Sequence, residues 1–201
     1  SSGLYTKQRD KRYLYILMYS SMQKYVEVKV QDTVATGTTT VDETGNLELQ
    51  DGAATFTGGV VNTGDVVHDT SDDRMYTVAT VVDANTLSLV AIGAALGTGL
   101  NTGKNYIIYS SSVSTKQLVA SDGVVIVENA AADPINSEVN IQYCGADGIA
   151  IKITHAAVAA GNEAIRDGFQ DSINASLIQP WPHVKYIGWL PSSLILGIAK
   201  V

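Results

Sequence analysis

The sequence predicts an α+β fold that is mainly β. We expect a discontinuous antiparallel sheet domain with one amphipathic helix, carrying an inserted small β-barrel or sandwich. Three observations predict this. Gly, Thr, Ser and Val are abundant while only 16% of the residues are charged, a mixture that suits short strands joined by tight turns. Short apolar runs alternate with turn signals over most of the chain. A helical period occurs once, near the C-terminus.

The first predicted strands lie in residues 12–30. Residues 13–19 (Tyr-Leu-Tyr-Ile-Leu-Met-Tyr) are apolar on both faces, which is typical of a central strand that is covered on each side. Residues 25–30 alternate, as a half-buried strand does. Residues 31–44 are rich in Thr and Gly and poor in large apolar side chains, so we expect a linker there.

Residues 45–110 are predicted to form the inserted domain. Turn signals such as Asp51-Gly52 separate short apolar segments. Strands of this length, with a turn about every ten residues, are typical of a small antiparallel barrel or sandwich. The polar run 110–115 is expected to be a second linker. The best predicted strands of the insert are residues 65–68, 75–82, 86–91 and 105–109.

The only predicted helix spans residues 162–177. Its apolar side chains recur every four residues, which places them in one stripe along a helix. Asn162 is a suitable N-cap, and Pro180 prevents the helix from continuing. The stripe consists of Ile165, Phe169, Ile173 and Leu177.

The outer domain is predicted to combine residues 1–32 with residues 113–201. Its N-terminal strand must pair with strands that follow the insert, so we expect the two outer pieces to fold together. The helix would lie across one face of the sheet. Further strands are expected at residues 117–120, 124–128, 138–143, 149–154, 184–190 and 194–199.

Charge divides the chain into a short basic start and an acidic body. The formal net charge is −7, and residues 1–12 carry +3, which leaves −10 for the rest of the chain. An acidic body is not expected to bind nucleic acid, because phosphate neutralisation needs clustered Lys and Arg. The basic start is either an arm that contacts an acidic neighbour or DNA, or a solvated segment without a partner. Its cations are Lys7, Arg9, Lys11 and Arg12.

The sequence predicts neither a disulfide nor a membrane span. The single cysteine, Cys144, excludes an intrachain disulfide and a multi-cysteine metal site. It follows an alternating run, so we expect a buried thiol. No apolar stretch reaches the roughly 18 residues that a bilayer span requires, and the N-terminus lacks a signal-peptide pattern. We therefore expect a soluble protein made in the cytoplasm.

The sequence contains none of the common catalytic or phosphate-binding motifs, so we expect no enzyme, no cofactor and no metal. The densest polar cluster lies in residues 65–73. It is either a Ca²⁺ site or a solvated hairpin turn, and the missing calcium-loop spacing favours the turn. This cluster consists of Asp65, His68, Asp69, Asp72 and Asp73. His155 and His183, which lie elsewhere in the chain, are expected to be structural.

Aromatic residues are the main interface candidates. Trp181 stands between Pro180 and Pro182, either as a core residue at the junction of helix and sheet or as an interface anchor, since Trp is enriched in binding hot spots. Tyr13, Tyr15 and Tyr19 lie in the first predicted strand. They fit sheet packing or a contact between subunits.

Two parts of the chain resemble structural proteins of tailed bacteriophages, those of marine phages and cyanophages in particular. The small β-module matches in its order of a Gly-Asp turn, a strand, a Leu-x-Leu strand and a closing Gly-x-x-Tyr-x-Ile segment. The C-terminal part matches in a strand pair, the helix start and a following Trp. The residues concerned are 53–56, 61–67, 76–83, 86–89, 103–109, 140–143, 151–156, 164–167 and Trp181.

The resemblance implies a non-catalytic virion protein, either a capsid decoration (cement) protein or a head–tail or tail component. It would be assembled in the host cytoplasm and would contact other virion proteins and copies of itself, in a trimer or ring. Nucleic acid contact is expected only through the basic arm. The interface candidates are Lys7, Arg9, Lys11, Arg12, Tyr13, Tyr15, Tyr19 and Trp181.

Two other functions stay open at this point. A binding module on a fibre, such as an adhesin or carbohydrate-binding domain, predicts exposed coplanar aromatic rings on the insert. A hydrolase predicts His68, His155 or His183 beside a carboxylate in a cleft. The aromatic residues available on the insert are Phe56, Tyr76, Tyr106 and Tyr109.

Overall fold

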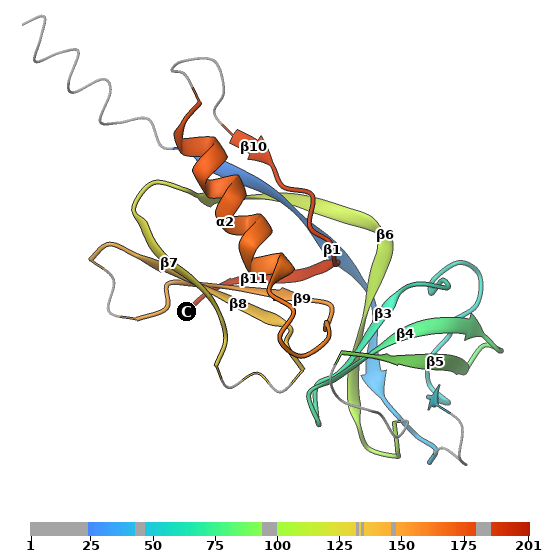
Figure 1. Ribbon diagram of the computed structural model, residues 1–201. Coiled ribbons are helices and arrows are strands. Elements are labelled where there is room, and N and C mark those ends of the chain that lie inside the picture. Colours follow the sequence, from blue (N-terminus) through green and yellow to red (C-terminus); the bar gives the residue numbers. More distant parts are fainter. Residues whose placement is uncertain are drawn as a thin grey trace, which may run out of the picture.

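The structure is a computed structural model that describes residues 24–42, 47–93, 100–131, 133, 135–145, 148–179 and 186–201. Within these residues the chain forms one helix and eleven strands (Figure 1). The predicted α+β, mainly β class is therefore confirmed. Among the same residues, no helix is long and apolar enough to cross a membrane.

The elements follow the predicted ones closely in the second half of the chain. The helix, α2, spans Ala164–Leu177. The strands are β1 Tyr25–Thr38, β2 Glu48–Gln50, β3 Val66–Asp69, β4 Arg74–Val81, β5 Thr86–Ile92, β6 Asn105–Ala120, β7 Val124–Asn129, β8 Glu138–Tyr143, β9 Ile151–His155, β10 Tyr186–Gly188 and β11 Ile195–Lys200.

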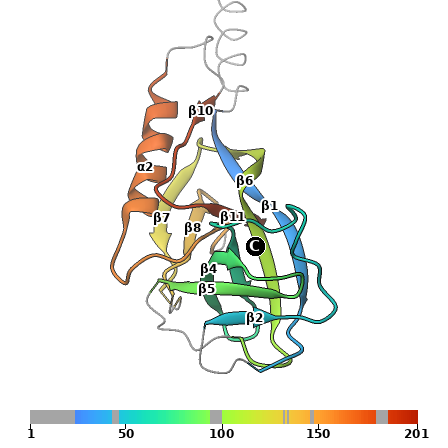
Figure 2. The same ribbon diagram turned by 90° about the vertical axis from the view of Figure 1, so that its right-hand side faces the viewer.

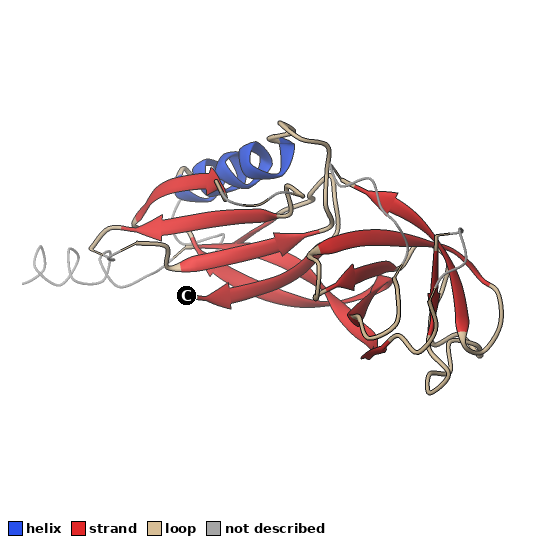
Figure 3. Cartoon of the chain, turned by 90° about the horizontal axis from the view of Figure 1, so that it is seen from below, coloured by secondary structure: helices blue, strands red, loops and turns tan. Residues whose placement is uncertain are grey.

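All strands belong to a single mixed sheet. Its order is β2-β5-β4-β3-β6-β1-β11-β9-β8-β7, and β10 also pairs with β1. Most pairs are antiparallel, as predicted, but β1 runs parallel to both β10 and β11. Parallel pairing needs a long crossover, which here includes α2. Seen from below, α2 covers one face of the sheet (Figure 3).

The two long strands, β1 and β6, run through both halves of the sheet. They pair from Tyr25↔Ala120 to Thr38↔Asn105, with register shifts on either side of Thr33. The predicted linkers at 31–44 and 110–115 are therefore wrong, because both runs lie largely within strands. Thr is a good strand former, so a polar surface run was mistaken for a loop. The polar run 110–115 instead marks a bulge in β6. There the pairing with β1 shifts from Gln31↔Ser114 to Thr33↔Tyr109.

The first hydrophobic core lies between α2 and the half of the sheet from β1 to β7. Phe169 and Trp189 meet at its centre with ring centroids 5.0 Å apart in an edge-on contact. Ile165, Phe169 and Ile173 are buried as predicted, whereas Leu177 is 42% exposed. The other buried members are Val26, Val28, Val30, Val119, Val139, Ile141, Ile153 and Ile195.

Lys24 fixes the start of β1 to both the helix end and the corner between β6 and β7. Its ammonium donates to the carbonyls of Leu177 (2.6 Å) and Gln179 (2.9 Å), where a cation complements the helix dipole. Its backbone N–H donates to Asp122 Oδ2 at 2.8 Å. At the other helix end, Asn162 Oδ1 accepts from Ala164 N at 3.0 Å, so Asn162 caps the helix from one position outside the N-cap.

The second core lies in the half of the sheet from β2 to β6. Its strand order is an open path that ends at β2, and it shares β1 and β6 with the other half (Figure 2). Whether the insert closes as a barrel or sandwich stays a prediction. The buried members include Leu49, Phe56, Val61, Val67, Tyr76, Val78, Leu87, Leu89, Leu100, Tyr106 and Ile108.

A third, smaller cluster joins the two halves. Val66 and Met75 from one half meet Ala156, Ala157 and other buried residues of the other half. The approach is close at Gly93, which has φ +84°, and a Cβ there would lie 2.6 Å from the Ala157 Cβ. Only glycine allows this backbone conformation and this contact together.

Cys144 departs from its predicted burial and is exposed. The strand that precedes it, β8, ends at Tyr143. Cys144 instead enters a turn in which its N–H donates to the Gly123 carbonyl at 2.7 Å. The alternating pattern was read one residue too far, since strand boundaries are set by turns that periodicity does not show.

Candidate functional site

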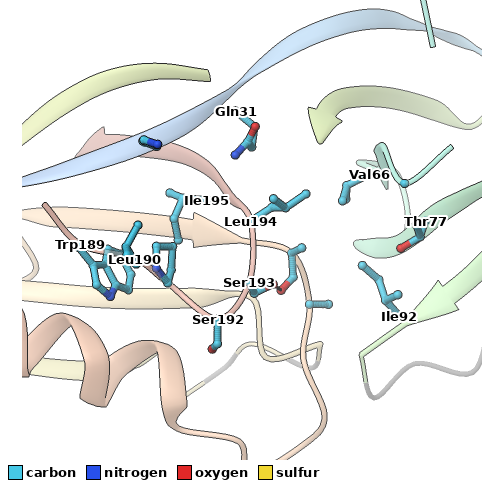
Figure 4. Close-up of a pocket in the computed structure, with 15 residues that line it drawn as sticks. Gln31, Val66, Thr77, Ile92, Trp189, Leu190, Ser192, Ser193, Leu194 and Ile195 are labelled. Carbon is cyan, nitrogen blue, oxygen red and sulfur yellow. Dashed lines mark hydrogen bonds between the residues drawn. The ribbon is translucent and has the colours of Figure 1, made fainter. Parts of the chain in front are cut away.

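A concave feature lies where the two halves of the sheet meet, and we call it the junction pocket. It is a half-open cavity of about 480 Å³. Val66, Thr77 and Ile92 line one side, and the segment from Trp189 to Ile195 lines the other (Figure 4). No sequence pattern indicated it, because its walls come from strands far apart in the chain.

The second wall of the junction pocket is a loop held by hydrogen bonds to the backbone of Ala156. Ala156 N donates to the Leu194 carbonyl at 2.8 Å, and Ser193 Oγ donates to the Ala156 carbonyl at 3.0 Å. Leu190, at the rim, is 85% exposed. The loop therefore presents an apolar side chain from a fixed backbone.

Gln31 closes the junction pocket on the side of the long strands. With its amide turned so that the nitrogen faces the β6 bulge, it donates to the carbonyls of Ser110 (2.8 Å) and Val113 (3.0 Å). Lys29 also lines the pocket, with Ser192 and Ser193. Apolar walls with a few hydroxyls suit packing against another surface, and none of these groups forms a nucleophile–base pair.

The acidic residues in 65–73 hold turns together. Asp65 is fully buried; its Oδ1 accepts from Ser111 N (2.8 Å) and Oγ (2.9 Å), and its Oδ2 from Asn62 N (2.8 Å). Asp69 Oδ1 accepts from Ser71 N at 2.9 Å. Asp65 therefore joins its own turn to β6, whereas Asp69 holds the turn that follows it.

The exposed acids of the same loop are paired as well. Asp72 Oδ1 lies 2.9 Å from Lys104 Nζ, and this hydrogen bond lowers the pKa of the Asp72 carboxyl. Asp73 Oδ1 lies 3.0 Å from His68 Nε2. In the part of the chain that the structure describes, no group of three or more His, Cys, Asp or Glu side chains is arranged to hold a metal ion.

A buried pair that the sequence did not indicate joins Asp51 and Tyr106. The Tyr106 hydroxyl donates to Asp51 Oδ2 at 2.7 Å. Burial, together with this hydrogen bond, raises the pKa of Tyr106. Phe56 and Tyr76 are buried too. Three of the four aromatic residues named for a carbohydrate platform therefore have no exposed face to offer a ligand.

The described histidines occupy structural positions. His155 is 1% exposed, and its Nδ1 lies 3.0 Å from the Ala156 carbonyl. Burial lowers its pKa. His68 does lie beside a carboxylate, Asp73, but it does not line the junction pocket. His183 lies outside the described residues.

The eight interface candidates predicted from the sequence all lie outside the described residues. The structure therefore neither brings them together nor separates them. They are Lys7, Arg9, Lys11, Arg12, Tyr13, Tyr15, Tyr19 and Trp181.

Exposed apolar side chains mark a different surface, at the end of the sheet beside α2. We call the outer side of β7 the β7 edge. β7 pairs with β8 on one side, and no strand of the described residues pairs with its other side. Val125 and Ile126 are 58% and 43% exposed, and Ile178, just after α2, is 80% exposed. A strand that ends a sheet is not distinguishable from an internal one by sequence pattern alone, so this surface was missed.

In comparisons with protein-family models, curated proteins and solved structures, nothing matches this chain.

Proposed function

We propose that this chain is a non-catalytic structural protein of a tailed-bacteriophage virion, acting through contacts between subunits. It would serve as a capsid decoration (cement) protein or as a head–tail or tail component. The observation that carries the assembly part is the β7 edge, a strand side that no described strand pairs with and that has exposed Val125 and Ile126 beside it.

An open, apolar strand edge is a pairing surface. Natural proteins usually protect such edges with charges, prolines or a covering segment, because unpaired N–H and C=O groups recruit another strand. In β7 the exposed positions near its start are Val125 and Ile126, and its charged residue, Glu128, comes later. Burying this edge against another chain would stabilise the assembled state by mass action.

The polar residues of the structure support a scaffold rather than a reacting centre. Asp51, Asp65 and Asp69 are buried and accept hydrogen bonds within the chain. His155 is buried against a backbone carbonyl. Each of these groups already has a structural partner, and a reacting group would need to be open to a substrate.

The virion assignment rests on the resemblance to tailed-phage structural proteins described above. Its partners would be other virion proteins and further copies of the same chain, in a trimer or ring, since closed symmetric assemblies are the common kind. The opposite charges of residues 1–12 and of the remaining chain favour contacts between copies.

The test is the mass of the purified protein in solution, measured by light scattering over a range of concentrations. We expect a defined trimer or larger ring. Ile126→Lys, which places a charge on the β7 edge, should shift the protein toward monomers. Val90→Lys is the matched control, because Val90 is 54% exposed on β5 in the other half, and it should assemble normally.

Two results would contradict the proposal. A wild-type protein that stays monomeric at every concentration does not self-assemble. Equal effects of Ile126→Lys and Val90→Lys would mean that the β7 edge is not the contact surface, and that added charge alone disperses the protein.

A further inference from the structure

We propose that residues 13–19 of one copy bind as an added strand, antiparallel to β7, along the β7 edge of a neighbouring copy. The inference rests on the proposed self-assembly and names the two surfaces that meet. It is a form of β-strand addition, in which backbone hydrogen bonds give affinity and alternate side chains give specificity.

The acceptor is the β7 edge. β7 spans Val124–Asn129 and is the last strand in the sheet order. The ladder to β8 has an irregularity between Val124 and Ile126. Beyond it, Ile126 to Asn129 pair continuously with β8, from Gln142 to Val139. This stretch is regular, and no strand of the described residues pairs with its outer N–H and C=O groups, which could therefore accept a further strand.

The occupant is chosen by its sequence. Residues 13–19 read Tyr-Leu-Tyr-Ile-Leu-Met-Tyr, a run of large apolar side chains with no charge, Gly or Pro. Such a run needs cover on both faces and has high strand propensity. Paired at the β7 edge, one of its faces would lie beside the exposed Val125 and Ile126.

Lys24 is the first described residue after this segment, and its position is fixed. Lys24 is held to Asp122 and to the end of α2, and Asp122 lies two residues before β7. The donor segment therefore joins the described chain beside the start of β7, the strand that carries the acceptor edge. Repeating one donor-to-edge contact builds a ring where the rotation between copies closes, and an open filament where it does not.

Charge sets the direction of the added strand. The basic residues Lys7, Arg9, Lys11 and Arg12 precede the apolar run. Figures 1 and 2 show that α2 and β7 run in opposite directions, so the C-terminal end of β7 and the N-terminal end of α2 lie toward the same end of the molecule. Glu128 is exposed there on β7. At α2, Glu163 and Asp167 are exposed and both pair with Arg166, at 2.6 and 2.7 Å, which leaves this group of three residues with a net charge of −1. An antiparallel strand carries its basic residues toward these acids, whereas a parallel one carries them away.

The experiment is a complementation of two variants. Ile16→Pro removes a backbone donor from the middle of the donor segment, and Ile126→Lys places a charge on the acceptor edge. Thr6→Pro is the control for the first, because it lies outside the apolar run. We expect each variant alone to be monomeric by light scattering and sedimentation, and Thr6→Pro to assemble like the wild type.

Mixing gives the decisive result. The Ile16→Pro chain keeps an intact edge and the Ile126→Lys chain keeps an intact donor segment, so an equimolar mixture should form a two-chain complex with one copy of each. Neither variant should form such a complex with itself. Circular dichroism and thermal unfolding of each variant confirm that both monomers are folded.

Three other outcomes overturn the inference in distinguishable ways. If Ile16→Pro assembles like the wild type while Ile126→Lys does not, the edge binds something other than residues 13–19, and the proposed function stands. If both variants are destabilised monomers that do not combine, the segment pairs within its own chain. If the wild type is monomeric at all concentrations, the self-assembly on which the inference rests fails as well.

Discussion

Single buried carboxylates hold neighbouring segments together in the half of the sheet between β2 and β6. Asp65 accepts three hydrogen bonds, from Asn62 N and from Ser111 N and Oγ. It thereby ties the turn before β3 to the bulge of β6. The Gly64-Asp65 pair noted in the sequence is therefore part of the structure around the bulge. Both carboxylate oxygens of Asp65 already accept hydrogen bonds, so neither is free for a cation.

Asp65→Ala should lower the free energy of unfolding by about 3 kcal/mol, because it leaves buried N–H donors without an acceptor. Asp83→Ala is the control: Asp83 is exposed, and among the described residues its carboxylate accepts from Asn85 N alone, at 2.8 Å, so its loss should cost less than about 1 kcal/mol. Urea unfolding measures both. If both variants lose the same free energy of unfolding, Asp65 contributes no more to stability than an exposed turn residue does.

Tyr106 couples stability to alkaline pH. Its pKa is raised above the usual 10.0 by burial and by its hydrogen bond to Asp51. The unfolded chain therefore loses this proton at a lower pH than the folded protein does. The stability linked to this group is complete below the unfolded pKa and is lost as pH rises toward the folded one.

The free energy of unfolding should consequently fall as pH rises above about 10, the unfolded tyrosine value. In Tyr106→Phe this fall should be smaller, though not absent, since burial also raises the pKa values of Tyr109 and Tyr143. Urea titrations at stepped pH values, compared with Tyr109→Phe, test the assignment. An unchanged pH profile in Tyr106→Phe would refute it.

At the scale of elements, local patterns predicted most strands and the helix, and failed where tertiary context decides. The predicted helix at 162–177 agrees with α2 at Ala164–Leu177, because its apolar stripe is a local signal. The linkers at 31–44 and 110–115 were wrong because Ser and Thr serve equally in loops and in exposed strands. The junction pocket and the β7 edge were missed because both depend on strand order, which no single segment encodes.

Gly93 tests how the two halves are joined. Gly93→Ala adds a Cβ 2.6 Å from the Ala157 Cβ and 3.1 Å from the Ile135 carbonyl, in a backbone with φ +84°. Gly103 has nearly the same φ, +83°, with nothing near an added Cβ, so Gly103→Ala carries the backbone cost alone. That shared cost is about 1 kcal/mol.

The difference between the two glycine variants should therefore report the packing at the junction. We expect Gly93→Ala to cost about 2 kcal/mol more than Gly103→Ala in the free energy of unfolding, as overpacking typically does. Thermal and urea unfolding measure it. If both variants lose the same stability, the contact between Gly93 and Ala157 does not hold the halves together.

At the scale of the whole molecule, the distribution of charge makes assembly sensitive to salt. Residues 1–12 carry +3 and the rest of the chain −10, so copies joined through the basic segment are attracted by exposed charges. Raising the salt from about 0.05 M to about 0.5 M shortens the screening length from about 14 Å to about 4 Å. The assembled fraction at a fixed protein concentration should therefore fall.

This salt dependence separates the two parts of the proposed contact. An Arg9→Gln, Lys11→Gln variant keeps the apolar run at 13–19 but loses two cations, so it should assemble more weakly at low salt and respond less to added salt. Sedimentation at stepped salt concentrations measures both effects. If salt instead strengthens the assembly of wild type and variant alike, apolar burial alone drives it. The basic segment would then be solvated and without a partner.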